Sequence, residues 1–329
     1  MRCINRRRRR RRNYKILILP VILIVLGLFA AILCSKQAFL LKYEKEHYQG
    51  NLYQYNLPVD KLCVSTNDVR HSGFETEDKF HAISLLDIQE GKVIYAEDIH
   101  EKLYPASTTK IMTAYLALKH GNLEDEIIVS ANAQDIPIDS SRAGLRIGDK
   151  LLLKDLMYAL MLPSGNDAAV AIAEHIAGSV DEFVTLMNEE AFKLGATNTH
   201  FVNPHGYQDD NHYTTAYDLY LMFNACMVIP EFQTIISSPY YELQITQQNG
   251  TYRNERWTQS NWYINGNASD PEGMNSIGGK TGTTDEAGSC LITLFEDEQK
   301  KPYLAIIMGA ESRTVIYDNM NQMILSTLQ

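Results

Sequence analysis

Residues 105–115 read PASTTKIMTAY, and the interpretation of the whole chain starts from this stretch. Ser107 and Lys110 stand three residues apart, so a helix that begins here carries a nucleophile and a base on one face. Apolar residues then recur at helical spacing: Ile111, Met112, Ala114, Tyr115 and Leu118. Gly121 is expected to end the helix. A serine and a lysine at a helix start are usually a cap and a solvated side chain, so the pair needs support from elsewhere.

Two further motifs supply that support. A Ser-Gly-Asn triplet at 164–166 follows a proline, and a Lys-Thr-Gly triplet at 280–282 follows two glycines. Taken alone, the first is typical of a turn and the second of a hairpin bend. The first motif is expected at a helix start, the second in a loop and the third on a strand. Three motifs in this order and in these contexts are typical of an acyl-transfer site. A solvated lysine has a pKa of about 10.4, so Lys110 can act as a base only if burial and a nearby cation such as Lys280 lower its pKa.

The periodicity of the remaining chain predicts an α/β fold. Helices are expected at 152–162, 167–176, 180–194, 214–227 and 315–328. Strands are expected at 81–88, 93–96, 240–247, 276–283, 288–295 and 302–308. Strands at both ends with helices between them predict an antiparallel sheet that brings the ends together, flanked by helices and a helical subdomain.

The first residues differ sharply in charge from the rest. Residues 1–15 carry nine basic side chains and no acidic one, which leaves 21 basic against 40 acidic residues beyond them. The run 16–35 has no charge and is long enough to cross a bilayer. We expect a basic cytoplasmic tail, an uncleaved single-pass anchor at 16–35, an extracellular stalk at 36–76 and a catalytic domain at 77–329, outside the cell membrane. The acidic body argues against a nucleic-acid partner.

The residues around the motifs resemble a known family. Besides 105–115, the matching stretches are LPSGNDAA at 162–169, NPHG at 203–206, HYTTAYD at 212–218 and GKTGTTDEAG at 279–288. Over about residues 80–325 the chain resembles the penicillin-recognising serine D,D-peptidases, most closely the low-molecular-mass D-alanyl-D-alanine carboxypeptidases. The resemblance implies the fold that these enzymes share with β-lactamases.

The resemblance also assigns roles to residues. Ser107 would attack the carbonyl between two D-alanines, and the backbone N–H groups of Ser107 and Thr283 would form the oxyanion hole. Lys110 would act with Ser164 and Asn166, which would relay protons and hold the peptide. The terminal carboxylate of the substrate would be bound by the third motif and an arginine: Lys280, Thr281, Gly282, Thr283 and Arg313.

The implied activity is removal of the terminal D-Ala from peptidoglycan stem pentapeptides, with β-lactams as covalent inhibitors. A D,D-endopeptidase, a β-lactamase and a non-catalytic sensor of β-lactams or peptidoglycan are the alternatives. The sensor is disfavoured because both Ser107 and Lys110 are kept. A lactamase needs a base that activates water, but the acids after the second motif are expected on exposed helix faces: Glu174, Asp181, Glu182, Glu189 and Glu190.

No metal or other cofactor is expected. His200, His205 and His212 lie close together in the sequence, but their spacing matches no zinc-binding pattern. Loop histidines that form local hydrogen bonds are the favoured interpretation.

Overall fold

The computed structural model describes residues 62–328. The predicted tail, the predicted anchor and residues 36–61 of the predicted stalk lie outside the described residues. Within 62–328, no single helix is long and apolar enough to cross a membrane. One pair of consecutive helices, Ala216–Met227 and Pro230–Ile236, meets the criterion only when joined, and the two are bent by 112°.

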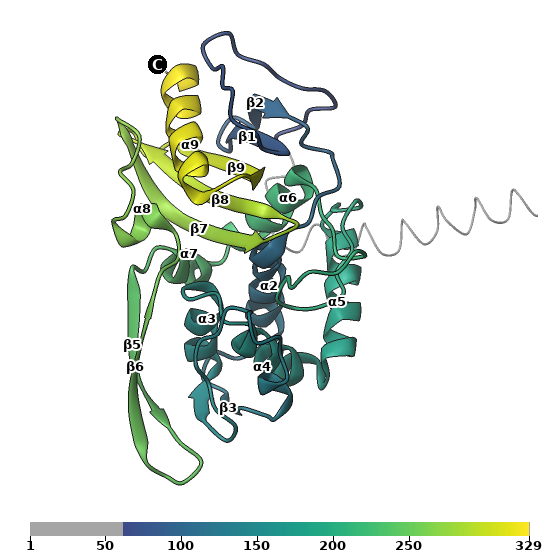
Figure 1. The fold of residues 1–329 in the computed structure, drawn as a ribbon, viewed down its shortest axis with the longest axis vertical. Helices are drawn as coiled ribbons and strands as arrows, with labels where there is room; N and C mark the ends of the chain where they lie inside the picture. The colour runs from purple at the N-terminus through teal and green to yellow at the C-terminus, as the bar shows by residue number, and fades with distance from the viewer. Residues whose placement is uncertain (1–61, 329) are drawn as a thin grey trace, which may run out of the picture. The chain divides into compact units, whose positions relative to one another are not determined.

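A five-stranded antiparallel sheet brings the two ends of the described chain together (Figure 1). Its strand order is β2-β1-β9-β8-β7. The bounds are β1 (Ala82–Asp87), β2 (Lys92–Glu97), β7 (Met274–Thr284), β8 (Gly288–Asp297) and β9 (Pro302–Ala310). The predicted hairpin is formed by β1 and β2, and every residue of β1 also pairs with β9. The predicted antiparallel sheet is therefore confirmed.

Both faces of this sheet are buried, because successive side chains of a strand point to opposite faces. On β9, Ile306 packs into the core shared with the helical body, whereas Ile307 packs into a second core beneath α9 (Arg313–Leu328). Apolar side chains of α9 fill that second core: Ile316, Tyr317, Met320, Met323 and Ile324. The sheet is thus held between one C-terminal helix and a layer of helices from the middle of the chain.

The helical layer has α2 at its centre (Figure 1). Its helices are α2 (Lys110–His120), α3 (Leu153–Met161), α4 (Asn166–Ala177), α5 (Val180–Lys193), α6 (Ala216–Met227) and α7 (Pro230–Ile236). The first eight residues of α2 are all buried, including Lys110. Side-chain caps fix two helix starts, because Ser179 accepts from the N–H of Glu182 and Thr215 accepts from the N–H of Asp218. All the helices predicted from periodicity are present, with ends shifted by a few residues.

A second, smaller sheet lies beside the helices, with the strand order β3-β4-β5-β6. Its strands are β3 (Glu126–Ile128), β4 (Lys150–Leu152), β5 (Tyr240–Thr246) and β6 (Tyr252–Thr258). The last two form a long two-stranded ribbon that runs alongside the helical layer (Figure 1). Only β5 of this sheet is predicted from sequence. The ribbon exposes alternate side chains, so the charged residues of β6 hide the apolar signal by which a strand is recognised.

Two details differ from the sequence-based prediction. The helix expected from Ser107 begins as a 3₁₀ turn, Ala106–Thr109, and becomes α-helical only at Lys110. Ala106 has a φ of 47°, a conformation that an α-helix cannot contain. In addition, residues 62–76 fall within the predicted stalk, yet Cys63 is fully buried and Val69 pairs with Ala96 of β2. Packing onto the domain therefore starts before the predicted boundary at 77.

Candidate active site

The three motifs converge from three elements. The first spans the 3₁₀ turn and the start of α2, the second spans the turn between α3 and α4, and the third lies within β7. Strand β7 passes directly against the 3₁₀ turn, and a Cβ atom at Gly282 would lie 2.9 Å from the backbone nitrogen of Ser107. Glycine at this position therefore allows the third motif to approach the first.

Lys110 is the centre of the site. It is fully buried, and its Nζ contacts Ser107 Oγ at 3.0 Å, Asn166 Oδ1 at 2.7 Å and the backbone oxygen of His205 at 2.7 Å. Burial lowers the pKa of Lys110 well below its usual range, and the charge of Lys280 lowers it further, against an opposing effect of Asp167. A neutral amine has two N–H groups for Asn166 and His205 and a lone pair for the Ser107 hydroxyl proton. The geometry suits a base.

A second buried lysine lies across the site. Lys280 Nζ donates to Ser164 Oγ at 2.9 Å and to the backbone oxygen of Thr281 at 2.9 Å. Burial lowers the pKa of Lys280 to about 7, with a smaller contribution from the charge of Arg313. Ser164 has a φ of 65°, which is unusual for a residue other than glycine. Such strain occurs at functional positions, and here it turns the hydroxyl toward Lys280.

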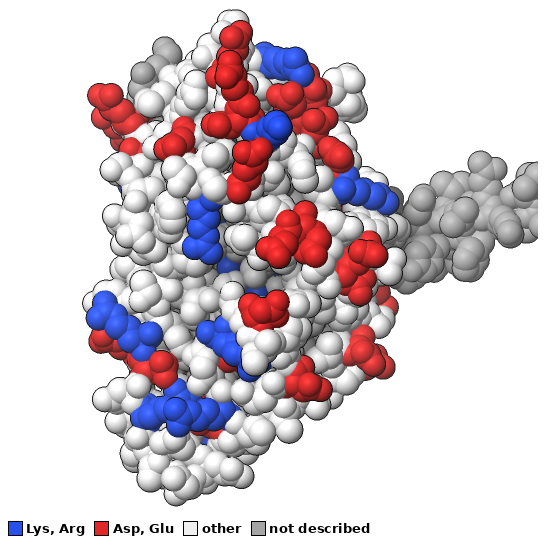
Figure 2. Space-filling view, in the orientation of Figure 1, with Lys and Arg blue, Asp and Glu red and all other residues white. Residues whose placement is uncertain are grey.

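The site also contains residues that the sequence motifs do not identify. Ser260 Oγ lies 2.7 Å from Thr281 Oγ1. A cleft of about 450 Å³ opens onto Ser107, Asn166 and Thr283. Its other walls come from 139–141, 206–208 and 284–286, which include three acidic residues: Asp139, Asp285 and Glu286. Gly206 and residues 284–286 fall inside stretches that resemble the family, whereas no periodicity or motif singles out residues 139–141, Tyr207 or Gln208. Acidic side chains gather over the upper and right-hand parts of the face shown in Figure 2.

Arg313 does not join the cleft directly. It is exposed at the first residue of α9, and it is not among the residues within 62–328 that line the cleft. Its charge nevertheless lowers the pKa of Lys280. The structure therefore places Arg313 within electrostatic reach of the third motif, and its contact with a carboxylate stays a prediction.

The three histidines form local hydrogen bonds, as predicted, and His212 accepts its local bond from the N–H of Val202 while its other ring nitrogen contacts a distant element. His200 Nδ1 lies 2.6 Å from the backbone oxygen of Asn211, and His205 Nδ1 accepts from the N–H of Tyr207. His212 Nε2 lies 2.8 Å from Thr109 Oγ1, which ties the loop to the start of α2. Burial lowers the pKa of His205 to about 3 and that of His212 to about 4, so both are neutral. Residues 62–328 contain no group of three or more His, Cys, Asp or Glu arranged to hold a metal.

Two acids depart from the exposed positions expected of the helical acids, because Glu190 is buried and Glu174 is half-buried. Glu190 is 2% exposed, because it forms ion pairs with Lys119 of α2 and Lys193 of its own helix. Glu174 accepts hydrogen bonds from Ser130 and Asn132. The remaining acids of this set are exposed: Asp181, Glu182 and Glu189. None of the five lines the cleft within the described chain.

A buried lysine against a serine, a second buried lysine on the adjacent strand and a cleft open to the serine together define a serine acyl-transfer site. The family model described as D-alanyl-D-alanine carboxypeptidase matches residues 74–312. The chain belongs to this family.

Individual relatives agree with this assignment. The chain is 34% identical to D-alanyl-D-alanine carboxypeptidase DacF of Bacillus subtilis over 69% of this chain and 57% of that protein. It is 35% identical to D-alanyl-D-alanine carboxypeptidase DacD of Escherichia coli over 73% of this chain and 63% of that protein. The crystal structure of the Streptomyces K15 DD-transpeptidase superposes with a TM-score of 0.70 at 27% identity, covering 77% of this chain and 99% of that one. The chain thus spans about three-fifths of the length of these two curated relatives.

Proposed function

We propose that this protein is a serine D,D-carboxypeptidase that removes the terminal D-Ala from peptidoglycan stem pentapeptides and is acylated by β-lactams. The observation that carries the proposal is the contact of the buried Lys110 amine with Ser107 Oγ at 3.0 Å, in a chain of the D-alanyl-D-alanine carboxypeptidase family. Serine becomes a useful nucleophile only when a base takes its proton.

The proposed reaction has two steps. In acylation, the Lys110 amine takes the proton of Ser107, and Oγ attacks the carbonyl carbon of the penultimate D-Ala. The C–N bond breaks, and the departing amine of the terminal D-Ala takes the proton that Lys110 accepted from Ser107. Asn166 holds the Lys110 amine during this step, and Lys280 holds the Ser164 hydroxyl across the site. In deacylation, water attacks the ester, the shortened peptide leaves as a carboxylic acid, and Ser107 regains its proton.

Lys280 is proposed to bind the terminal carboxylate as a cation, which gives a pH dependence. The fraction of Lys280 that carries a proton falls as pH rises through its pKa of about 7. For a substrate with a free C-terminal carboxylate, kcat/KM should therefore decline above about pH 7 in the wild type. Lys280→Arg keeps its charge at high pH and should remove this decline. If kcat/KM of the Lys280→Arg variant declined with the same midpoint pH as the wild type, another group would be the cause of the decline.

The products of three incubations test the function. Mass spectrometry of a stem pentapeptide should show loss of one D-Ala, and a cross-linked dimer should remain intact if the protein is not an endopeptidase. A third incubation adds an amine acceptor, because a structural relative is named a DD-transpeptidase. A transpeptidase would yield the acceptor-linked tetrapeptide. Fast turnover of penicillin would instead favour the β-lactamase, and no reaction with any substrate would favour the sensor.

The proposed location is the outer side of the cell membrane, with one anchor at 16–35. An uncharged run of this length behind a basic tail supports the proposal. A chain that begins at Lys36 should be released from membranes and should be labelled by a fluorescent penicillin at the rate of the full chain. Fractionation of cells that express either chain measures this. A shortened chain that stays with the membrane would rule out 16–35 as the sole anchor.

A further inference from the structure

One wall of the cleft is a segment with no regular structure of its own. Residues 139–149 lie between the 3₁₀ turn η3 (Asn132–Gln134) and β4, and they form only turns and extended backbone. Three of these residues line the cleft that opens onto Ser107: Asp139, Ser140 and Ser141. Since no helix or strand fixes this segment, its position relative to Ser107 depends on contacts with the elements on its two sides.

On the inner side, the segment is bonded to the second motif. The N–H of Asn166 donates to the backbone oxygen of Ser141 at 2.9 Å. Asp167 is 1% exposed, and its two carboxylate oxygens accept from the N–H groups of Ala143 at 2.8 Å and Leu145 at 3.0 Å. Asn166 is also the residue whose side chain accepts from the Lys110 amine at 2.7 Å. The segment and the base therefore share Asn166 as a neighbour.

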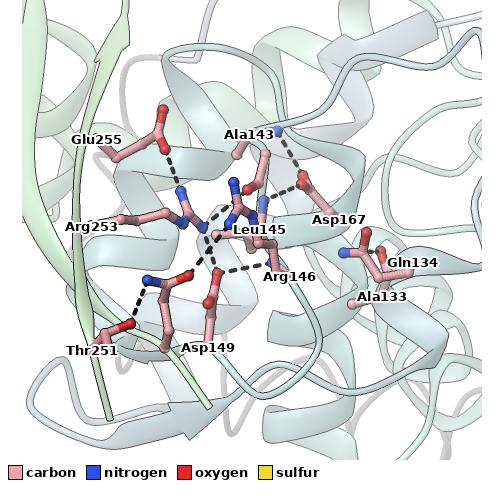
Figure 3. Close-up of polar contacts among 12 residues, drawn as sticks. Ala133, Gln134, Ala143, Leu145, Arg146, Asp149, Asp167, Thr251, Arg253 and Glu255 are labelled. Carbon is pink, nitrogen blue, oxygen red and sulfur yellow. Dashed lines mark hydrogen bonds and ion pairs between the residues drawn. The ribbon is translucent and has the colours of Figure 1, made fainter. Parts of the chain in front are cut away.

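On the outer side, the segment is bonded to strand β6 of the ribbon (Figure 3). Arg253 Nη2 pairs with Asp149 Oδ2 at 2.5 Å and donates to the backbone oxygen of Gly144 at 3.0 Å. Asp149 is 1% exposed, so this pair is shielded from solvent. Trp257 stands four residues further along β6, on the same face. Its Nε1 donates to the backbone oxygen of Ala143 at 2.8 Å.

Ala143 is thus held from both sides, by Asp167 at its N–H and by Trp257 at its carbonyl oxygen. We propose that Arg253 and Trp257 are positioning residues for acyl transfer, because their bonds to the 139–149 segment hold it next to the turn that carries Asn166. This inference rests on the proposed function. A displaced segment would lose its bond to the backbone of Asn166, and the Asn166 amide would then no longer be held against the Lys110 amine.

Trp257→Phe is the sharpest test, because it keeps an aromatic ring in the core and removes the N–H that reaches Ala143, together with part of the indole ring. Loss of one hydrogen bond of ordinary strength should slow acylation by a fluorescent penicillin by about threefold to tenfold. Tyr241→Phe is the matched control, since that hydroxyl joins the neighbouring strand β5 to Asp155 of α3 and not to the segment. It should acylate at the wild-type rate.

Arg253 is tested in a form that does not leave the buried Asp149 carboxylate unpaired; Glu255, the other acid that pairs with Arg253, is 31% exposed. The double variant Arg253→Met with Asp149→Asn removes both charges, and it should slow acylation by about tenfold or more. Arg253→Lys should recover part of the rate, because its ammonium still pairs with Asp149. Arg256→Met is the control on the same strand, since Arg256 is 57% exposed and pairs with Glu242 of β5.

Acylation rates are measured at a temperature well below the midpoint of thermal unfolding of each variant. Each rate is divided by the concentration of active sites that can be acylated. A purely structural role would lower the midpoint and leave these rates unchanged, which would overturn the proposal. Equal slowing in the Tyr241 and Arg256 controls would also overturn it. If the wild type itself is not acylated, the proposed function fails. If the wild type is acylated and Trp257→Phe matches it, only the positioning role fails.

Discussion

Ser107→Ala is expected to abolish both D-Ala release and labelling by a fluorescent penicillin. Ser107 is the serine whose Oγ lies against the buried Lys110 amine, and it lines the cleft. Removing the nucleophile of a serine hydrolase typically lowers kcat by about 10⁶-fold, because no other group can form the acyl-enzyme. The measurements are D-Ala release from a pentapeptide and the intensity of the labelled band after electrophoresis.

Ser140→Ala is the matched control for this prediction. Ser140 lines the same cleft, but its hydroxyl donates to the backbone oxygen of Pro137 in its own loop. The variant should be labelled like the wild type. A labelled band in Ser107→Ala, with the acyl group mapped to another serine by mass spectrometry, would refute the assignment of the nucleophile.

The nucleophile and its base are predictable from sequence because their geometry is local. Three residues along one helical stretch bring Ser107 next to Lys110 whatever the rest of the chain does, and the structure has this contact. The main sheet is predictable for a related reason. Its strands are apolar on both faces and bounded by turns, so β8 and β9 stand out from the neighbouring sequence.

The remainder of the site depends on tertiary contacts that leave no local pattern. The pKa of Lys280 falls because the strand is buried against Ser164, which lies 116 residues away. Among the acids of the cleft, Asp139 comes from a loop outside every stretch that resembles the family. Strand β6 shows no apolar alternation, because its ribbon is half exposed and its charged residues pair with other segments. The lowered pKa of Lys280, the lining of the cleft and strand β6 all depend on contacts between segments that are distant in the sequence. Such contacts leave no periodic pattern of apolar residues in a single sequence.

The two buried lysines should respond in opposite ways to the same substitution. Lys110 is proposed to act as a neutral base, whereas Lys280 is proposed to act as a cation. Arginine keeps a positive charge at any accessible pH and cannot accept the proton of Ser107. Lys110→Arg should therefore slow acylation by about 10²-fold to 10⁴-fold, the usual contribution of a general base. Lys280→Arg should retain most of the acylation rate at neutral pH.

The pH dependence of acylation provides a second measure that needs no substitution. Burial and the charge of Lys280 lower the pKa of Lys110, so the neutral amine becomes populated far below the pH at which a solvated lysine loses its proton. The rate should rise as pH increases through this lowered pKa and reach its maximum below the pH at which a solvated lysine loses its proton. If Lys110→Arg acylated as fast as the wild type, Lys110 would be acting as a cation, and the proton of Ser107 would need another acceptor. Among the described residues that contact Ser107 Oγ, no side chain other than Lys110 can accept this proton. Such a result would therefore indicate that a water molecule or the substrate itself acts as the base.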